Sequence, residues 1–338
     1  MKEQVQEIVD KWGEVEGFSG VISVSGDDGV IYQKAFGYRN KAEELPNTVD
    51  TAFAIASGTK LFTALAACKL IDEGKLALSD KIWNVLPYDL KEVDKDVTVE
   101  HLLTHTSGVG DYIDEEADSE YFDILKLYEN HPSFKWTSLE SYLPMIVDLR
   151  PKFKPGERVG YSNAGFILLG LVIEAASNKD YHEYINENII IPLKFKHTGY
   201  YPLNNLPKNS ALGYISDDDD DGDPGTTTNI LFMPIIGGSD GGIFTCADDL
   251  DTLWKAIMSD RIFSAKMREL FFTPHEDFGL GVYLDENEGK KVYFTVGGDY
   301  GVDFVSAYFP STRIIVSALG NTEINTFPLM EKLFEVVS

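Results

Sequence analysis

The order of β-type and helix-type segments constrains the fold of this chain more than any other feature. Short runs rich in β-branched and aromatic residues lie near the N-terminus and return only after about residue 279, with mostly helix-type patterns between them. A sheet built from both ends of the chain, with a mainly helical region inserted, satisfies this order. We therefore predict an α+β fold in which helices flank an antiparallel sheet.

Individual elements follow from local patterns. The first two β-type runs, 18–24 and 30–36, are separated by turn residues and predict a hairpin. Residues 51–56 are either a short strand or an extended entry into a helix predicted over 59–73, which Gly74 would terminate.

The remaining predicted elements are mostly late in the chain. The N-terminus fits an amphipathic helix, and 163–177 is the strongest candidate for a buried helix. The predicted late elements are strands over 279–284, 291–296, 302–309 and 313–319, and a helix over 326–337. We expect a sheet domain from 1–60 with 200–338, a mainly helical domain over 61–199, and an active site at their junction.

Composition excludes several classes of function. The formal net charge of −26 would repel phosphate backbones, so we expect no nucleic-acid partner. The longest apolar run, 164–173, is shorter than the roughly 20 residues that a membrane span needs. Because the N-terminus lacks the apolar core of a signal peptide, a cytoplasmic location is expected as the sequence stands, and an exported one if a leader was trimmed. The oligomeric state is left open.

Metal and redox motifs are weak. Asp217–Asp221 partly matches an EF-hand loop, but Thr228 stands where the twelfth-position Glu is needed. His101 and His105 have the spacing of a zinc helix without its Glu, which favours a structural interpretation. Cys68 and Cys246 lie in no metal or redox spacing and are expected to be buried thiols. We therefore expect no metal and no other cofactor.

The tetrapeptide Ser57-Gly58-Thr59-Lys60 is a candidate for nucleophilic chemistry. Residues three apart share a helix face, so Lys60 would lie beside Ser57 and could accept its proton. Taken alone, the motif is far more typical of an N-cap serine followed by a surface lysine. In Tyr161-Ser162-Asn163, the tyrosine could transfer a proton and the asparagine could bind a substrate amide, or both could be structural.

Four stretches in a fixed order resemble the serine β-lactamase and penicillin-binding protein superfamily, on the branch of class C β-lactamases, D,D-peptidases and esterases. They cover most of the chain from about residue 18 to residue 320, and they read FAIASGTKLFTALAACKLIDEGKLALSDKI, VTVEHLLTHTSGV, KFKPGERVGYSNAGFILLGLVIE with IPLKFKHTGY, and GGSDGGIFTCADDL with the late strands. The resemblance implies that Ser57 is the nucleophile, that Lys60 and Tyr161 share proton transfer, and that Asn163 binds the substrate amide.

The third motif of that superfamily is incomplete here. A Lys or His is usual on the strand that lines the site, but Thr295 or Val296 stands in its place before Gly297 and Gly298. The glycines are expected to contact substrate, with the Gly298 N–H completing an oxyanion hole with that of Ser57. The missing cation disfavours anionic substrates unless Lys290 or Lys291 replaces it.

The resemblance implies a serine hydrolase that forms an acyl-enzyme with a small-molecule or peptide-like substrate. An ester, a peptide-like amide and a β-lactam remain open as the substrate, with the neutral ester or amide favoured. A non-catalytic penicillin-binding-like regulatory or binding protein is the alternative. A metallohydrolase is disfavoured, since only His101 and His105 lie close together in the sequence.

Overall fold

The computed structural model describes residues 1–15, 17–113, 124–215, 225–287 and 289–337. Its central element is a six-stranded sheet in which every neighbouring pair is antiparallel. Strands from both ends of the chain meet at the pairing of β1 with β10, where Val21 lies opposite Leu319. In spatial order the strands are β2 (Gly29–Phe36), β1 (Gly20–Gly26), β10 (Ile314–Gly320), β9 (Val302–Phe309), β8 (Lys290–Asp299) and β7 (Tyr283–Asn287).

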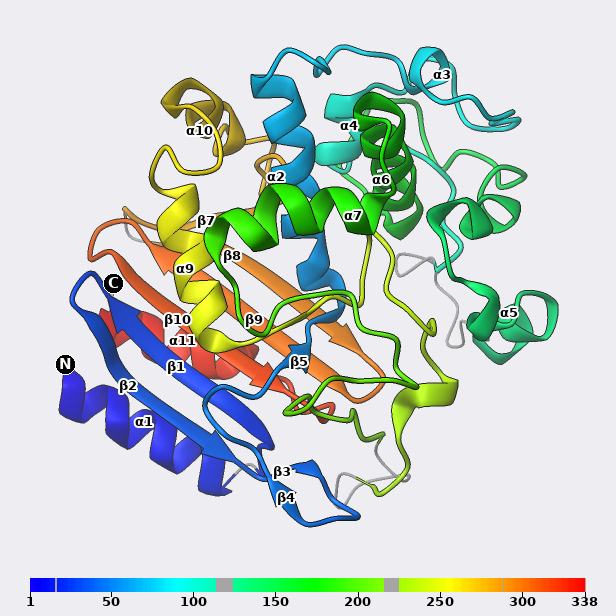
Figure 1. Cartoon of the computed structure of the whole chain (residues 1–338). Helices are drawn as coiled ribbons and strands as arrows, with labels where there is room; N and C mark the ends of the chain where they lie inside the picture. The colour runs from blue at the N-terminus through cyan, green and yellow to red at the C-terminus, as the bar shows by residue number, and fades with distance from the viewer. Residues whose placement is uncertain (16, 114–123, 216–224, 288, 338) are drawn as a thin grey trace.

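Alternating side chains of this sheet contribute to two apolar cores, as the period of two in a strand requires. Along β9, Phe304 packs on one side, whereas Val305 packs on the other. Helices α1 (Lys2–Val15) and α11 (Phe327–Val337) cover the second side and contact each other, so both termini lie on the same face (Figure 1). Helix α9 (Ala247–Ile257) contacts β1 and β10, and with α2 (Thr59–Asp72) it contributes to the first core.

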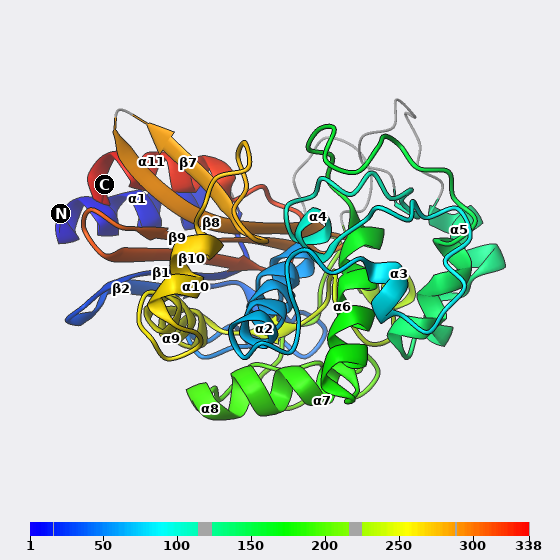
Figure 2. The same ribbon diagram turned by 90° about the horizontal axis from the view of Figure 1, so that it is seen from above.

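The rest of the chain forms a helical region beside the sheet (Figure 2). Its longest helix, α6 (Asn163–Ser177), contacts α2 and lies within the same apolar core. The other helices of this region are α3 (Ile82–Val85), α4 (Val99–Leu103), α5 (Ile124–Asn130), α7 (Tyr181–Ile185) and α8 (Ile191–Leu193). Helix α10 (Ala265–Phe271) lies next to α9 on the sheet side (Figure 2). The short 3-10 and π-type turns are η1 (Ala56–Gly58), η2 (Ser133–Lys135), η3 (Leu139–Met145), η4 (Asn186–Ile190) and η5 (Asn229–Leu231). Two small two-stranded sheets pair β3 (Tyr38–Asn40) with β4 (Leu45–Pro46) and β5 (Phe53–Ala54) with β6 (Phe244–Thr245).

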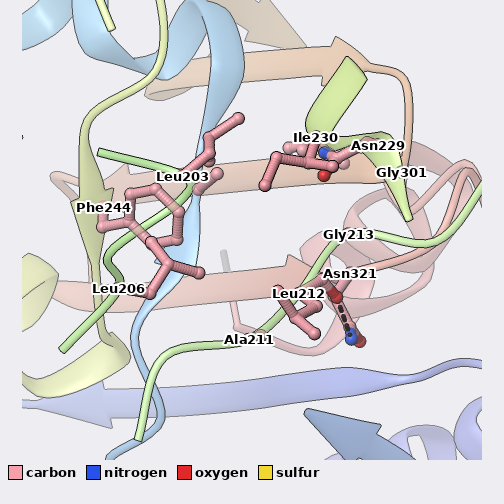
Figure 3. Close-up of a pocket in the computed structure, with 13 residues that line it drawn as sticks. Leu203, Leu206, Ala211, Leu212, Gly213, Asn229, Ile230, Phe244, Gly301 and Asn321 are labelled. Carbon is pink, nitrogen blue, oxygen red and sulfur yellow. Dashed lines mark hydrogen bonds between the residues drawn. The ribbon is translucent and has the colours of Figure 1, made fainter. Parts of the chain in front are cut away.

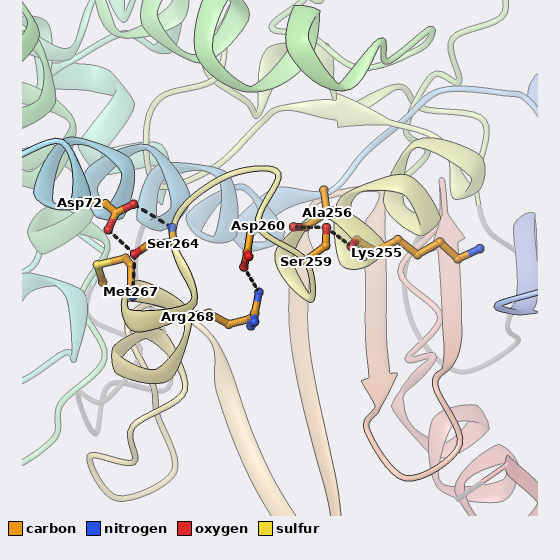
Figure 4. A network of polar contacts seen from close by, with 8 residues as sticks. All are labelled: Asp72, Lys255, Ala256, Ser259, Asp260, Ser264, Met267 and Arg268. Atoms are coloured by element: carbon orange, nitrogen blue, oxygen red, sulfur yellow. Dashed lines mark hydrogen bonds and ion pairs between the residues drawn. The ribbon is translucent and has the colours of Figure 1, made fainter.

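The far end of α2 is fixed by a polar network (Figure 4). The Asp72 carboxylate accepts hydrogen bonds from the backbone N–H and the hydroxyl of Ser264, at 2.7 and 2.6 Å. The same hydroxyl accepts from the Met267 N–H at 3.3 Å and so caps α10. These hydrogen bonds lower the pKa of Asp72. Helix α2 is thus held at this end by α10 and at its other end by the sheet.

The α+β prediction is confirmed, and most of its elements fall where they were expected. The predicted strand over 279–284 is wrong in position, because β7 begins only at Tyr283. The region after α2 also contains fewer helical residues than predicted, since α3, α4 and α5 have four, five and seven residues. The predicted division into 1–60 with 200–338 and 61–199 stays a prediction, because one apolar core continues from the sheet into α6.

Other sequence interpretations have plain outcomes. Cys68 and Cys246 are both buried and unbonded, as predicted. Asp217–Asp221 lies outside the described residues. Within the described ranges, no helix is both long and apolar enough to span a bilayer.

Candidate active site

Ser57 lies in the turn η1, between the short strand β5 and the first turn of α2. The residue before it, Ala56, has a φ of 42°, a left-handed conformation that L residues rarely adopt. The Ala56 carbonyl is held by the Thr59 hydroxyl at 2.7 Å and by the Gly242 N–H at 3.4 Å. This strained turn presents a half-buried Ser57 at the N-terminus of a helix, where the helix dipole favours negative charge.

Lys60 is the second residue of α2 and is only 4% exposed. Its Nζ donates to Ser57 Oγ at 3.0 Å, to Asn163 Oδ1 at 2.7 Å and to the Asp240 carbonyl at 2.7 Å. The alternative interpretation of a surface lysine is therefore wrong. These three acceptors fix the amine beside the serine oxygen, which is the geometry that proton transfer between them requires.

Tyr161 reaches the same serine from the other side of the site. Its hydroxyl donates to Ser57 Oγ at 2.8 Å, although 104 residues separate them in the sequence. The Tyr161 ring stacks on the His105 ring with a centroid distance of 4.7 Å. Lys60 Nζ lies 4.9 Å from the centroid of the Tyr161 ring. Ser57, Lys60 and Tyr161 thus form one hydrogen-bonded cluster.

The two histidines with zinc-like spacing have separate structural contacts. His101 takes part in the capping box of α4 with Thr98. His105 is buried, and its Nδ1 accepts from the Ser162 N–H at 3.2 Å. Burial, with the Lys60 charge nearby, lowers the pKa of His105 to about 3. A neutral His105 therefore supports the Tyr161 ring.

The N-terminus of α6 positions Asn163. The Ser162 hydroxyl accepts from the Gly165 N–H at 2.9 Å, and the Asp111 carboxylate accepts from Asn163 N–H at 2.6 Å and from Ala164 N–H at 3.2 Å. The sequence interpretation missed Asp111, whose role depends on a helix start some fifty residues later. Burial raises the pKa of Asp111 to about 7, against the effect of these backbone hydrogen bonds.

Gly297 brings strand β8 against the Ser57 turn. A Cβ placed on it would lie 2.2 Å from the Ile55 carbonyl oxygen and 2.9 Å from Ser57 N, so only glycine allows this approach. A Cβ on Gly298 would meet nothing within 4 Å, which leaves open space beside this strand. The contribution of the Gly298 N–H to an oxyanion hole stays a prediction.

No lysine or histidine occupies the superfamily's cationic position on β8. Thr295 is buried on the side of the strand that Gly297 shares, and it lies opposite Ser306 of β9. Lys290 and Lys291 begin this strand, so Lys290 is seven residues from Gly297, or about 23 Å at the rise of a β-strand. The suggestion that these lysines replace the missing cation is therefore wrong.

Asp240 is a second acid that the sequence interpretation missed. Its carbonyl accepts from Lys60, and its buried carboxylate accepts a short hydrogen bond from the Tyr112 hydroxyl. Burial raises the pKa of Asp240, whereas the Lys60 charge opposes this shift. Asp240 lies beside Gly241 and Gly242, and no local sequence pattern marked it as an acid next to the lysine.

An aromatic cavity adjoins this cluster. Asp240 and Gly241 form part of its wall, together with Tyr112, Trp136 and Tyr142. A smaller neighbouring pocket shares Phe244, Leu203 and Asn229 with it and is lined mainly by aliphatic side chains (Figure 3). The smaller pocket has no ionisable residue in its lining, so we assign it no role in the chemistry.

A family comparison agrees with this geometry. The sequence profile of the family described as Beta-lactamase matches residues 5–333. The chain belongs to the Beta-lactamase family. Among the described residues of this Beta-lactamase family member, no cluster of three or more His, Cys, Asp or Glu side chains could hold a metal ion.

Relatives of this Beta-lactamase family member include penicillin-binding proteins. Penicillin-binding protein 4* of Bacillus subtilis (strain 168) is 27% identical over 343 residues, covering 96% of this chain and 73% of the relative. The crystal structure of a penicillin binding protein from Bacillus halodurans superposes with a TM-score of 0.89 at 35% identity, covering 98% of this chain and 99% of that one. A D-stereospecific amidohydrolase from Streptomyces sp. shares the fold, with a TM-score of 0.80 at 22% identity and coverage of 100% and 98%.

These matches confirm the resemblance to the serine β-lactamase and penicillin-binding protein superfamily. They place this Beta-lactamase family member among the serine hydrolases at the level of the superfamily.

Proposed function

We propose that this protein is a serine hydrolase that acts through an acyl-enzyme on a neutral ester or a peptide-like amide. The observation that carries the proposal is the hydrogen bonding of Ser57 Oγ by both Lys60 at 3.0 Å and Tyr161 at 2.8 Å. A serine hydroxyl is too weak an acid to react unaided, and an adjacent base activates it. Lys60 and Tyr161 are the two groups near enough to do so.

In the proposed reaction, Ser57 Oγ attacks the substrate carbonyl while its proton passes to the Lys60–Tyr161 pair. The backbone N–H groups of Ser57 and Gly298 hold the resulting oxyanion. The carbon–oxygen or carbon–nitrogen bond then breaks, and the pair returns the proton to the leaving group. Water attacks the acyl-enzyme in the same way and releases the acid. Asn163, held against Lys60 at 2.7 Å, orients the amine and can bind a substrate amide.

The missing cation on β8 favours neutral substrates over β-lactams. A β-lactam carries a carboxylate, and Thr295 offers it no positive charge. The net charge of −26 adds a long-range penalty for an anion. We therefore rank the neutral ester and amide above the β-lactam.

Substitution of the nucleophile tests the proposal. We expect Ser57→Ala to lower kcat/KM for p-nitrophenyl esters by at least about 1000-fold, since the nucleophile is lost. Lys60→Met should act similarly, whereas Lys69→Met, on the same helix and paired with Glu73 at the surface, should not. Circular dichroism and thermal unfolding check that each variant folds. Unchanged ester hydrolysis by Ser57→Ala would refute the mechanism.

A covalent probe separates the hydrolase from the alternative, a non-catalytic binding protein. A fluorophosphonate or a labelled penicillin should add its mass to wild type at Ser57 and not to Ser57→Ala. Intact-protein mass spectrometry followed by peptide mapping measures this. The absence of any adduct with either reagent would favour the non-catalytic protein.

A further inference from the structure

The cavity beside the Ser57 cluster is lined by aromatic rings that contact one another. Trp136 lies 5.1 Å from Tyr142, 5.6 Å from Tyr128 and 6.1 Å from Tyr112 between ring centroids. Tyr112 lies in a loop, Tyr128 in α5, Trp136 directly after η2 and Tyr142 in η3. Stacked and edge-on aromatic walls bind apolar rings, and their faces attract cations.

Two carboxylates belong to the same cavity. Asp240 forms part of its wall beside Lys60, and Asp299, at the end of β8, lines it from the sheet side. Asp299 is exposed and lies two residues after Gly297, which packs against the Ser57 turn. A group bound among the rings would thus lie against a wall that includes the Asp299 carboxylate, two residues along β8 from the glycine that packs against the Ser57 turn.

The cavity contains a buried polar atom with no partner. The Tyr142 side chain is 2% exposed, and its hydroxyl makes no hydrogen bond with any residue in the described ranges. An unpaired buried hydroxyl is costly, so such groups are usually satisfied by a ligand or by water. Since the hydroxyl oxygen can accept a hydrogen bond, an N–H donor would suit it.

The cavity offers these features to a cation and little to an anion. In the cluster of Ser57, Lys60 and Tyr161, Lys60 carries the positive charge. Its amine already donates hydrogen bonds to Ser57, Asn163 and Asp240. No lysine, arginine or histidine lines the cavity among the described residues. A substrate carboxylate would therefore meet two acids and no opposing charge.

From this arrangement we infer that the cavity binds an aromatic group carrying a protonated amine, and that Asp299 selects substrates with this group. The inference rests on the proposed function for its catalytic consequence. Within the proposed esters and amides, it moves the preferred substrate from a neutral one to one whose aromatic acyl group carries a positive charge.

Three p-nitrophenyl esters test this selectivity. Their acyl groups are phenylacetyl derivatives that differ only in the para substituent, which is aminomethyl, ethyl or carboxymethyl. We expect kcat/KM to fall in that order, with the aminomethyl ester at least about 5-fold above the ethyl ester, the range of a partly exposed ion pair reinforced by aromatic faces.

Substitutions at Asp299 identify the residue responsible. Asp299→Asn should remove most of the preference for the aminomethyl over the ethyl ester, and Asp299→Lys should favour the carboxymethyl ester. Asp285→Asn is the matched control, because Asp285 likewise accepts the N–H of the residue that follows it but lies on β7, away from the cavity. A wild type that does not prefer the aminomethyl ester, or an Asp299→Asn variant that keeps the preference, would overturn the inference while leaving the proposed hydrolase intact.

A binding measurement keeps the inference testable if no ester is hydrolysed. Benzylamine and benzyl alcohol are titrated calorimetrically into Ser57→Ala, which cannot turn over substrate. Tighter binding of benzylamine, weakened by Asp299→Asn and not by Asp285→Asn, would support the cavity assignment even if the hydrolase proposal fails. Equal affinities for the two compounds, or no binding of either, would refute it.

Discussion

At the scale of single residues, the site depends on the absence of side chains as much as on their presence. Gly297 allows strand β8 to touch the Ser57 turn, and Gly58 allows Phe304 to approach within 2.3 Å of where its Cβ would be. Gly297 belongs to the sheet and Gly58 to the turn before α2, and each faces the other side of this contact. The distance between the reacting serine and the strand is therefore set by these two positions.

Substitution of glycines inside and outside the site tests this view. We expect Gly297→Ala to lower kcat/KM by about 100-fold or more, because its Cβ would push β8 away from Ser57 N and misplace the oxyanion donors. Gly26→Ala, at the end of β1, is the control, since its Cβ would meet only ordinary contacts with Ile31 at 3.7 Å and Ile314 at 4.0 Å. Ester hydrolysis and thermal unfolding of both variants measure the outcome. Equal losses in the two variants would show that backbone contact at Gly297 does not set the site geometry.

At the scale of elements, the sequence predicts best where a segment is stabilised by its own pattern. Helix α6 begins at Asn163 and ends at Ser177, as predicted, because an apolar run follows an N-cap serine. The strand over 279–284 was misplaced because the apolar residues there belong to a turn. At Gly281, with a φ of 75°, the chain packs against Ala64 of α2, a contact that no local pattern reveals.

The same reasoning explains which site residues were found. Ser57, Lys60, Tyr161 and Asn163 occur in short motifs that the superfamily resemblance made specific, and the structure brings them together. Asp111, which is half-buried, and Asp240, which is buried, lie in loops, and each has its hydrogen-bond partners far away in the sequence. Their environment, rather than their spacing, makes them part of the site, so local sequence carried no signal for them.

The Asp111 carboxyl group, which holds the start of α6, makes the stability of the fold depend on pH. Its pKa is raised by burial from 3.8 to about 7, so between these values the folded chain binds more protons than the unfolded chain. This group's contribution to stability is therefore fully present at low pH and is lost as the pH rises toward about 7. We compare the free energy of unfolding of wild type with that of Asp111→Asn. The wild-type value should fall by about 2 kcal/mol more than the variant's between about pH 5.5 and pH 7, since each pH unit contributes up to about 1.36 kcal/mol.

Urea unfolding of both proteins across that pH range measures the difference. Asp89→Asn is a useful control, because Asp89 is exposed and also accepts a backbone N–H, from Lys91 at 3.2 Å. A difference between wild type and Asp111→Asn that stays constant or grows with pH would contradict the burial of an acid at the start of α6.

At the scale of the whole molecule, the charge of −26 acts on every ionic substrate before it reaches the site. The potential of so acidic a chain lowers the local concentration of anions and raises that of cations. Salt screens this effect, with a Debye length of about 10 Å at 0.1 M and about 30 Å at 0.01 M. The net charge of the whole molecule and the local carboxylate of Asp299 therefore both favour cationic substrates. Their contributions can be separated, because salt screens the long-range effect.

Ionic strength distinguishes the two contributions. From about 10 mM to about 500 mM NaCl, we expect kcat/KM to fall for the aminomethyl ester, to rise for the carboxymethyl ester and to change less than about 2-fold for the ethyl ester. Asp299→Asn should reduce the preference for the amine at every salt concentration yet keep most of the salt dependence, because the other 54 acidic residues of the 55 remain. If the neutral ester responded to salt as strongly as the charged ones, the dependence would reflect the state of the enzyme and not the attraction of its substrates.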